Sequence, residues 1–312
     1  MKVVVSGYHD TMKLLELTPK GVQVLDCYPI INASFIITDG TYYYTYEQEP
    51  TLKFVSFTLL KNHFVKVDEI PVPGKGLTHL TLSNKHEILV GASYHDGMVH
   101  EVQIREGHFV SPITTIQDHN NLGLSRPHWV GFTPQEDELL IVNIAQDRIG
   151  ICDWALKPIR DIHLEKGVGP RHALFNHDGT ILYVISEYSN ELISIHYQTG
   201  TVIEKHSTLL NPKVTSYGAT LAITQDEKML YASNRGDETI ACFKIHGSSC
   251  TLVSHIPTYG KHSRHMILSR DESLIVSANK DSSEIVFIDT HTHHKIGTHS
   301  YPNPTGLVEV HE

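Results

Sequence analysis

The sequence predicts an all-β protein, a single seven-bladed β-propeller domain over residues 1–312. Three observations support this fold class. Apolar runs of strand length recur with a fixed internal spacing, polar turn residues recur at the same place in each unit, and no segment has the long apolar stripe of a helix. Repeated four-stranded units that close into a ring are typical of propellers.

The clearest repeat unit spans residues 169–197. It contains three runs of strand length, RHALF, ILYVIS and LISIHY, and the third alternates apolar and polar residues. Residues 177–179 and 189–191 separate the runs and supply Asp, Gly and Asn. Because these residues tolerate the backbone angles of tight turns, we expect neighbouring strands of the unit to form antiparallel hairpins.

A spacing of 17 residues links the last apolar residue of the first strand, Phe175, to the first apolar residue of the third strand, Leu192. The same spacing occurs in five further units, which follow one another at steps of 43 to 50 residues. Four strands in about 45 residues correspond to one propeller blade. The further pairs are Ile37 and Phe54, Leu82 and Val99, Phe132 and Ile149, Ile223 and Ile240, and Leu268 and Ile285.

Six units leave both ends of the chain unassigned. The N-terminal runs KVVVSG and KLLEL are strand-like, as are KIGTHSY and TGLVEV near the C-terminus. A last blade with strands from both termini would close the ring and hide its open sheet edges. We therefore expect seven blades; a six-bladed ring with loose ends is the alternative.

Composition excludes several classes of function. The net charge of -10 argues against nucleic acid as a partner. No apolar run reaches the length of a membrane span, and the valine run at residues 3–5 is too short for a secretory signal. The scattered cysteines contain no C-x-x-C pair, so reduced thiols and a cytoplasmic location are expected. These cysteines are Cys27, Cys152, Cys242 and Cys250. We also expect a monomer or weak dimer.

Charged residues recur at one end of the predicted blades. In an antiparallel hairpin, the residue that begins the first strand and the residue that ends the second lie at the same end. Arginines at such positions would form a basic channel mouth that favours a small anion with a carboxylate or phosphate group, unless they only pair with each other. We call these residues the two mouth sets. The first, at the beginning of first strands, is Thr78, His128, Arg171, Ala219 and Arg264; the second, at the end of second strands, is Tyr94, Ile144, Glu187, Arg235 and Lys280.

Several segments resemble the repeat motifs of the seven-bladed lactonase family, which includes bacterial 6-phosphogluconolactonases and fungal carboxy-muconate lactonizing enzymes. The segments are GPRHALFNHDGTILYVISEYSNEL, LYASNRGDETIACFKI and SRHMILSRDESLIVSANKDSSEIVFI. YYTYEQ resembles an early Tyr-x-x-Glu segment of the family and GASYHDGMV its Asn-Tyr-x-x-Gly segment. Residues 143–147, NIAQD, depart from the family's Asp-Leu-Gly-x-Asp segment.

The resemblance implies a catalytic set that coincides with the strongest members of the mouth set: His128, Arg171, Glu187 and Arg235. Substrate contacts are expected from further residues, and no metal or cofactor is expected. These further residues are Arg264, Lys280, Tyr94, His79 and Glu47.

The predicted function is a lactone hydrolase that acts on a small anionic sugar-acid lactone. Glu187 would accept a proton from the attacking water, Arg171 and Arg235 would stabilise the oxyanion and the acidic group of the substrate, and His128 would protonate the leaving alcohol. Two alternatives remain open. One is a muconate-type cycloisomerase that acts on a dicarboxylic acid; the other is a non-catalytic propeller that binds an anionic metabolite or a protein partner.

Other histidines have weaker functional signals. The run 291–294, with His299 nearby, could bind a metal, but it follows a predicted third strand and is expected to be a solvated loop. His172 and His265 come directly after two of the arginines. Because successive strand residues point to opposite sides, we expect both imidazoles to pack between blades.

Overall fold

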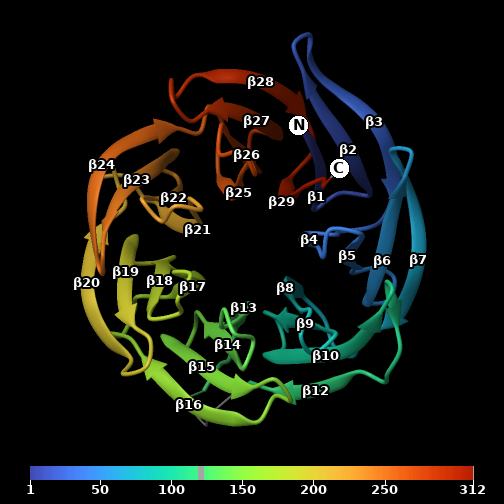
Figure 1. Ribbon diagram of the computed structural model, residues 1–312, viewed down its shortest axis with the longest axis horizontal. Helices are drawn as coiled ribbons and strands as arrows, with labels where there is room; N and C mark the ends of the chain where they lie inside the picture. Colours follow the sequence, from blue (N-terminus) through green and yellow to red (C-terminus); the bar gives the residue numbers. More distant parts are fainter. Residues whose placement is uncertain (119–122, 312) are drawn as a thin grey trace.

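The computed structural model describes residues 1–118 and 123–311 and shows a ring of seven antiparallel sheets (Figure 1). Each sheet is one blade, whose first strand lies at the centre of the ring and whose last strand lies at the rim (Figure 1). The described residues contain no helix, and therefore none that could cross a membrane. The predicted all-β, seven-bladed propeller is confirmed, and the six-bladed alternative is wrong.

The blades are numbered here by their inner strands along the chain. Blade 1 contains β4 (Ile36–Thr38), β5 (Tyr42–Glu47), β6 (Lys53–Leu60) and β7 (His63–Pro71). Blade 2 contains β8 (Leu77–Ser83), β9 (Ile88–Ser93), β10 (Met98–Arg105), β11 (His108–Phe109) and β12 (Thr114–Gln117). Blade 3 contains β13 (Pro127–Phe132), β14 (Glu138–Asn143), β15 (Arg148–Asp153) and β16 (Pro158–His163). Blade 4 contains β17 (Pro170–Phe175), β18 (Ile181–Ser186), β19 (Glu191–His196) and β20 (Thr201–Ser207).

The remaining blades complete the ring. Blade 5 contains β21 (Tyr217–Ile223), β22 (Met229–Arg235), β23 (Thr239–His246) and β24 (Ser249–Pro257). Blade 6 contains β25 (Ser263–Leu268), β26 (Leu274–Asn279), β27 (Glu284–Asp289) and β28 (Lys295–Ser300). Blade 7 contains β29 (Pro304–Glu309), β1 (Lys2–Gly7), β2 (Thr11–Thr18) and β3 (Gly21–Pro29).

Blade 7 is shared between the two ends of the chain, as predicted. Its inner strand β29 pairs with β1, with Val3 opposite Glu309 and Val5 opposite Leu307. The expectation for KIGTHSY was wrong: this run forms β28, which pairs with β27 as the outer strand of blade 6. The N-terminal segment supplies three strands of blade 7 and the C-terminal segment one.

Apolar burial lies between the blades. The described residues form seven buried clusters, one at each interface between neighbouring blades. Between blades 3 and 4, for example, Trp129 and Val142 pack with Val184 and Ile193. Middle strands are therefore covered on both faces, which explains why ILYVIS is apolar throughout, whereas the outer strand β20 is only partly buried.

Inner strands position the side chains of the channel. In six of them a β-bulge near the start of the strand inserts an unpaired residue, and bulges of this kind turn a side chain in a new direction. The repeated bulge gives a physical basis for the constant sequence offset of the first mouth set. The inserted residues are Thr78, His128, Arg171, Arg264 and Thr305, with Ala219 and Thr220 in blade 5.

Leu307→Ala should strongly lower the stability of the protein, because Leu307 helps to close the ring. Leu307 is 2% exposed and belongs to the apolar cluster between blades 6 and 7. Truncation should lower the free energy of unfolding by about 2–5 kcal/mol, measured by urea denaturation. The control Leu60→Ala, at a position that is 63% exposed, should change it by about 0.5 kcal/mol or less. Equal effects of the two substitutions would show that closure does not depend on this contact.

Candidate active site at the channel mouth

The residues that follow the second strand of each blade lie at one end of the channel. Glu187 follows β18, and its backbone N–H donates to the carbonyl of Gly169 over 2.7 Å. Corresponding residues of five other blades make the same bond to the segment before their inner strand, over 2.9 to 3.1 Å. The mouth is therefore built from equivalent backbone positions. These five residues are Tyr8, Gln48, Tyr94, Ile144 and Lys280.

A carboxylate between two guanidinium groups lies at the mouth. Oε2 of Glu187 lies 3.0 Å from Nε of Arg171 and 2.7 Å from Nη2 of Arg235. Arg171 also donates to the carbonyl of Ala219, and Arg235 to that of Gly218 over 2.7 Å. The arginines are 3% and 5% exposed, so the cluster is buried at the junction of blades 4 and 5. The predicted meeting of Arg171 and Glu187 at one end of the blade is confirmed.

Electrostatics favour the ionised form of Glu187. Burial raises the pKa of its carboxyl group, but the charges of Arg235 and Arg171 outweigh burial and hold the pKa below its usual value of 4.5. Burial and repulsion from Arg235 and Arg264 hold the pKa of Arg171 well below its usual value, although an arginine stays protonated. Three guanidinium groups and one carboxylate thus share the site, which leaves positive charge available to an anion.

The two carboxylate oxygens of Glu187 differ in their surroundings. Both ion pairs use Oε2, whereas Oε1 has no hydrogen-bond partner among the residues that the structure describes. Glu187 lines a cavity of about 200 Å³ at the mouth. The carboxylate is thus held by one oxygen and can accept a hydrogen bond from a ligand through the other. The cavity is lined by Tyr8, Thr78, Tyr94, His95, His128, Glu187 and Arg264.

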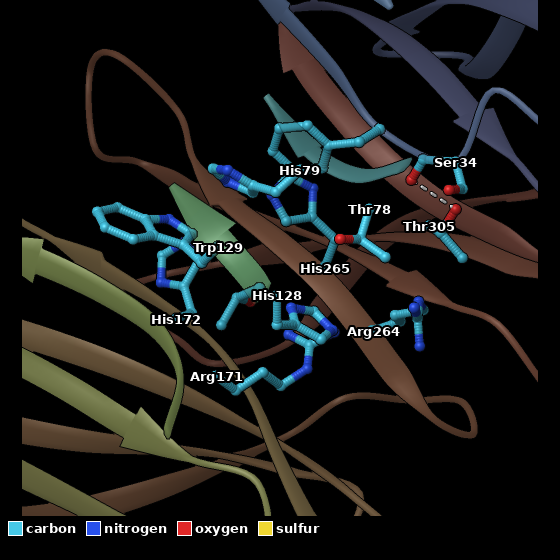
Figure 2. A pocket seen from close by; sticks show the side chains of 12 residues that line it. Ser34, Thr78, His79, His128, Trp129, Arg171, His172, Arg264, His265 and Thr305 are labelled. Carbon is cyan, nitrogen blue, oxygen red and sulfur yellow. Dashed lines mark hydrogen bonds between the residues drawn. The ribbon is translucent and has the colours of Figure 1, made fainter. Parts of the chain in front are cut away.

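His128 is neutral in this environment. Burial and the charges of Arg171, Arg264 and Arg235 hold the pKa of its imidazole well below 6.5. The imidazole lies beside Arg171 (Figure 2), and its ring centroid is 5.9 Å from that of Tyr94. Burial and these arginines therefore disfavour a protonated His128 near neutral pH in the free protein, and its role as the acid stays a prediction. Its position at the mouth is as predicted.

Arg264 differs from the other two arginines. Its Nη2 donates to the hydroxyl of Tyr8 over 3.1 Å, and its guanidinium carbon lies 5.4 Å from the centroid of the Tyr8 ring. No carboxylate of the described residues forms an ion pair with Arg264. Since Arg264 also lines the mouth cavity, it is the guanidinium group best placed to bind an anion there.

A family model described as lactonase, 7-bladed beta-propeller, matches residues 19–298. The chain belongs to this family. A 6-phosphogluconolactonase of Bacillus subtilis is 26% identical over 234 residues, which cover 70% of the chain and 67% of that relative. Two Staphylococcus relatives, from S. saprophyticus and S. epidermidis, match the chain over about half of their own length.

Solved structures show the same fold at low identity. A Lactobacillus plantarum protein superposes with a TM-score of 0.87 at 20% identity and covers 99% of this chain and 100% of its own. A periplasmic gluconolactonase of Pseudomonas aeruginosa superposes with a TM-score of 0.86 at 17% identity and covers 99% of each chain. This member of the lactonase family therefore has the family's propeller over nearly its whole length.

The lactonase-family propeller places the residues predicted to bind substrate in different environments. Tyr94 and Arg264 line the mouth cavity, and Nζ of Lys280 pairs instead with Asp281 over 2.8 Å. Glu47 is not among the described residues that line this cavity, and its Oε2 pairs with Nζ of Lys53 over 2.8 Å. The equivalent mouth position in this blade is one residue later, at Gln48. His79 lies deeper in the channel.

Two residues of the mouth, Tyr8 and His95, were missing from the predicted site. Tyr8 follows β1, so the offset rule would have found it if blade 7 had been aligned with the other blades. Nothing in the offset pattern points to His95. Its ring centroid lies 5.5 Å from that of Tyr94, the residue at the equivalent mouth position.

Residues 143–147 depart from the family segment at Asn143 and Ala145 but keep its last acidic residue, Asp147. Asp147 accepts hydrogen bonds from the backbone N–H groups of Gly167, over 2.8 Å, and Gly169, over 2.6 Å. Gly169 has a φ of +62°, and a Cβ there would lie 2.3 Å from the ring of Tyr188. The acidic residue of this segment therefore orders the loop that leads into Arg171.

The Nδ1 atoms of His172 and His265 accept hydrogen bonds from the backbone of the next inner strand, but both residues also line a cavity of the channel, so the expectation that they pack between blades is met only in part. The run 291–294 lies in the turn between β27 and β28 and is largely exposed. Over residues 1–118 and 123–311, no group of three His, Cys, Asp or Glu residues is arranged to hold a metal ion.

Glu187→Gln should destabilise the protein in a pH-dependent way. Loss of the carboxylate leaves buried arginine charge uncompensated, so the free energy of unfolding should fall by about 3 kcal/mol at pH 7. Because the folded pKa is depressed, the contribution of Glu187 is fully present above pH 4.5 and is lost as the pH falls through the folded pKa. Urea denaturation of both proteins between pH 3.5 and pH 8 measures this difference.

Glu165→Gln is the matched control, since this carboxylate is 79% exposed and pairs with Lys205 at the surface. Its effect should be about 1 kcal/mol or less. A Glu187→Gln variant as stable as this control at pH 7 would show that the carboxylate does not compensate the arginines.

Proposed function

We propose that this protein is a lactone hydrolase that acts on a small anionic sugar-acid lactone of the 6-phosphogluconolactone type. Family membership supports the reaction class, and the names of the Bacillus subtilis and Pseudomonas aeruginosa proteins support a sugar-acid lactone. The observation that carries the proposal is the ionised Glu187, which lines a basic cavity and whose Oε2 pairs with two arginines, while its Oε1 has no hydrogen-bond partner among the described residues.

In the proposed reaction, Oε1 of Glu187 accepts a proton from a water molecule as its oxygen attacks the lactone carbonyl. The bond between the carbonyl carbon and the ring oxygen then breaks. Glu187 gives the proton to the ring oxygen, which becomes the alcohol of the product, and returns to its ionised form. The product carboxylic acid releases its own proton to solvent, so the net reaction consumes one water molecule.

The arginines divide into two roles in this scheme. Arg171 and Arg235 hold Glu187 in place, because each pairs with its Oε2 and with a backbone carbonyl. Arg264, with Tyr8 beside it, binds the phosphate or carboxylate group of the substrate. A phosphate group carries about -1.5 to -2 charges near pH 7, which matches the excess of two formal positive charges in the site.

His128 acts as a neutral group that orients the substrate. With its pKa held well below 6.5, it offers one N–H donor and one nitrogen acceptor to the substrate, and no proton for the leaving alcohol.

A muconate-type cycloisomerase would need a similar charge balance, but no described contact favours it over hydrolysis.

Purified protein should hydrolyse 6-phosphogluconolactone well above the spontaneous rate. Glu187→Gln should lower kcat by about 100- to 10,000-fold, the usual contribution of a general base. Product acid is measured by pH-stat titration, with Glu165→Gln as the control of unchanged activity. Absence of activity in the unsubstituted protein would refute the proposed function, and full activity of Glu187→Gln would refute the proposed base.

Arg264→Gln should change substrate selectivity rather than chemistry. For 6-phosphogluconolactone, kcat/KM should fall about 100-fold, since a charge-assisted contact to the phosphate is lost. For uncharged glucono-1,5-lactone the change should stay below about threefold. Lys280→Gln removes a positive charge from the same blade outside the cavity and should leave both values unchanged. An equal loss on both substrates in Arg264→Gln would exclude a role in recognising the anionic group.

A further inference from the structure

A second, smaller cavity lies deeper in the channel. It has a volume of about 20 Å³, room for about one water-sized particle. Its walls come from inner strands on all sides of the ring, and Figure 2 shows His79, His172 and His265 on them with Trp129. Thr78, His128 and Arg264 line both this cavity and the larger one, so the two are neighbours along the channel.

Three histidines occupy equivalent positions in this cavity, each directly after the bulge of its inner strand. Nδ1 of His79 accepts a hydrogen bond from the backbone N–H of Val130 over 3.4 Å, in the next blade. His172 accepts from Leu221 over 3.4 Å. His265 accepts from Leu307 over 3.1 Å.

These hydrogen bonds fix the protonation of the rings. A nitrogen that accepts a backbone N–H carries no proton, so each imidazole is neutral and carries its proton on Nε2. Within the described residues, no acceptor is hydrogen-bonded to Nε2 of His79, His172 or His265. Three N–H donors on the cavity wall are thus free to donate to a ligand there.

The charges around this cavity are positive. Arg171 and Arg264 line it, and no carboxylate is among its described lining residues. Nε of Arg171 lies 3.0 Å from Oε2 of Glu187, and this one carboxylate compensates only part of the charge of Arg171 and Arg235. A buried excess of positive charge is costly unless a negative charge lies close to it.

We propose that the deep cavity is a binding site for a single halide-sized anion, held by the Nε2–H groups of His79, His172 and His265 beside Arg171. Chloride is a halide small enough for a cavity of about 20 Å³. Phosphate, sulfate and sugar acids are too large and would be confined to the mouth cavity of about 200 Å³. A cation is disfavoured by the two guanidinium groups. The bound anion would reduce the positive charge behind the catalytic site independently of any lactone chemistry.

Bromide, an anomalous scatterer, can replace chloride as the probe. Protein purified and crystallised in sodium bromide, without chloride, should show an anomalous peak within about 3.5 Å of the three Nε2 atoms. A peak only beside Arg264 in the mouth or only at the surface, which is an adventitious ion only, would overturn the proposal. A featureless deep cavity, or one that holds only water, would overturn it as well.

A solution measurement checks the same site. Sodium bromide at about ten times its dissociation constant should raise Tm by about 3 °C over sodium isethionate at equal ionic strength. His172→Phe should abolish this saturable rise, whereas the control His291→Phe, in the exposed turn after β27, should retain it. If His172→Phe does not fold, the anomalous map of the unsubstituted protein decides the question. A rise of equal size in isethionate would overturn the proposal.

Discussion

The ion-pair cluster of Arg171, Glu187 and Arg235 is the constraint on which the site depends. Its members come from blades 4 and 5, and the side chain of Arg171 also reaches the backbone of β21 in blade 5. The cluster can form only because a β-bulge turns Arg171 into the channel while a backbone hydrogen bond fixes Glu187 beside it. Closure of the ring in turn fixes the seven inner strands relative to one another around the channel.

The excess of guanidinium groups then sets the protonation of its neighbours. Against the effect of burial, the arginine charges keep Glu187 ionised; burial and the same charges together keep His128 neutral. In the proposed reaction the base is therefore the carboxylate of Glu187, and the neutral His128 does not act as the acid. The same excess charge makes anions the natural ligands of the channel, both at the mouth and in the deeper cavity lined by His79, His172 and His265.

Much of the fold and part of the site could be predicted from the sequence. The 17-residue spacing located six blades because strand and turn lengths are local properties. The offsets brought Arg171 and Arg264 to the mouth with Glu187 because the blades of all three repeat the same bulge and the same backbone hydrogen bond. KIGTHSY was assigned to the wrong blade because the rule ended at the third strand. Whether the imidazole of His128 is charged could not be predicted, since it depends on distances between side chains of several blades.

The pH dependence of kcat/KM for uncharged glucono-1,5-lactone, corrected for spontaneous ring opening, tests the central claim most directly. This substrate avoids the ionisation of a phosphate group near pH 6. We predict a flat profile between pH 5.5 and 8 and a fall as the pH drops below about 4.5, where Glu187 begins to be protonated. An inflection near pH 6.5 that disappears in His128→Gln would contradict the account, because it would show that the arginines do not keep His128 neutral.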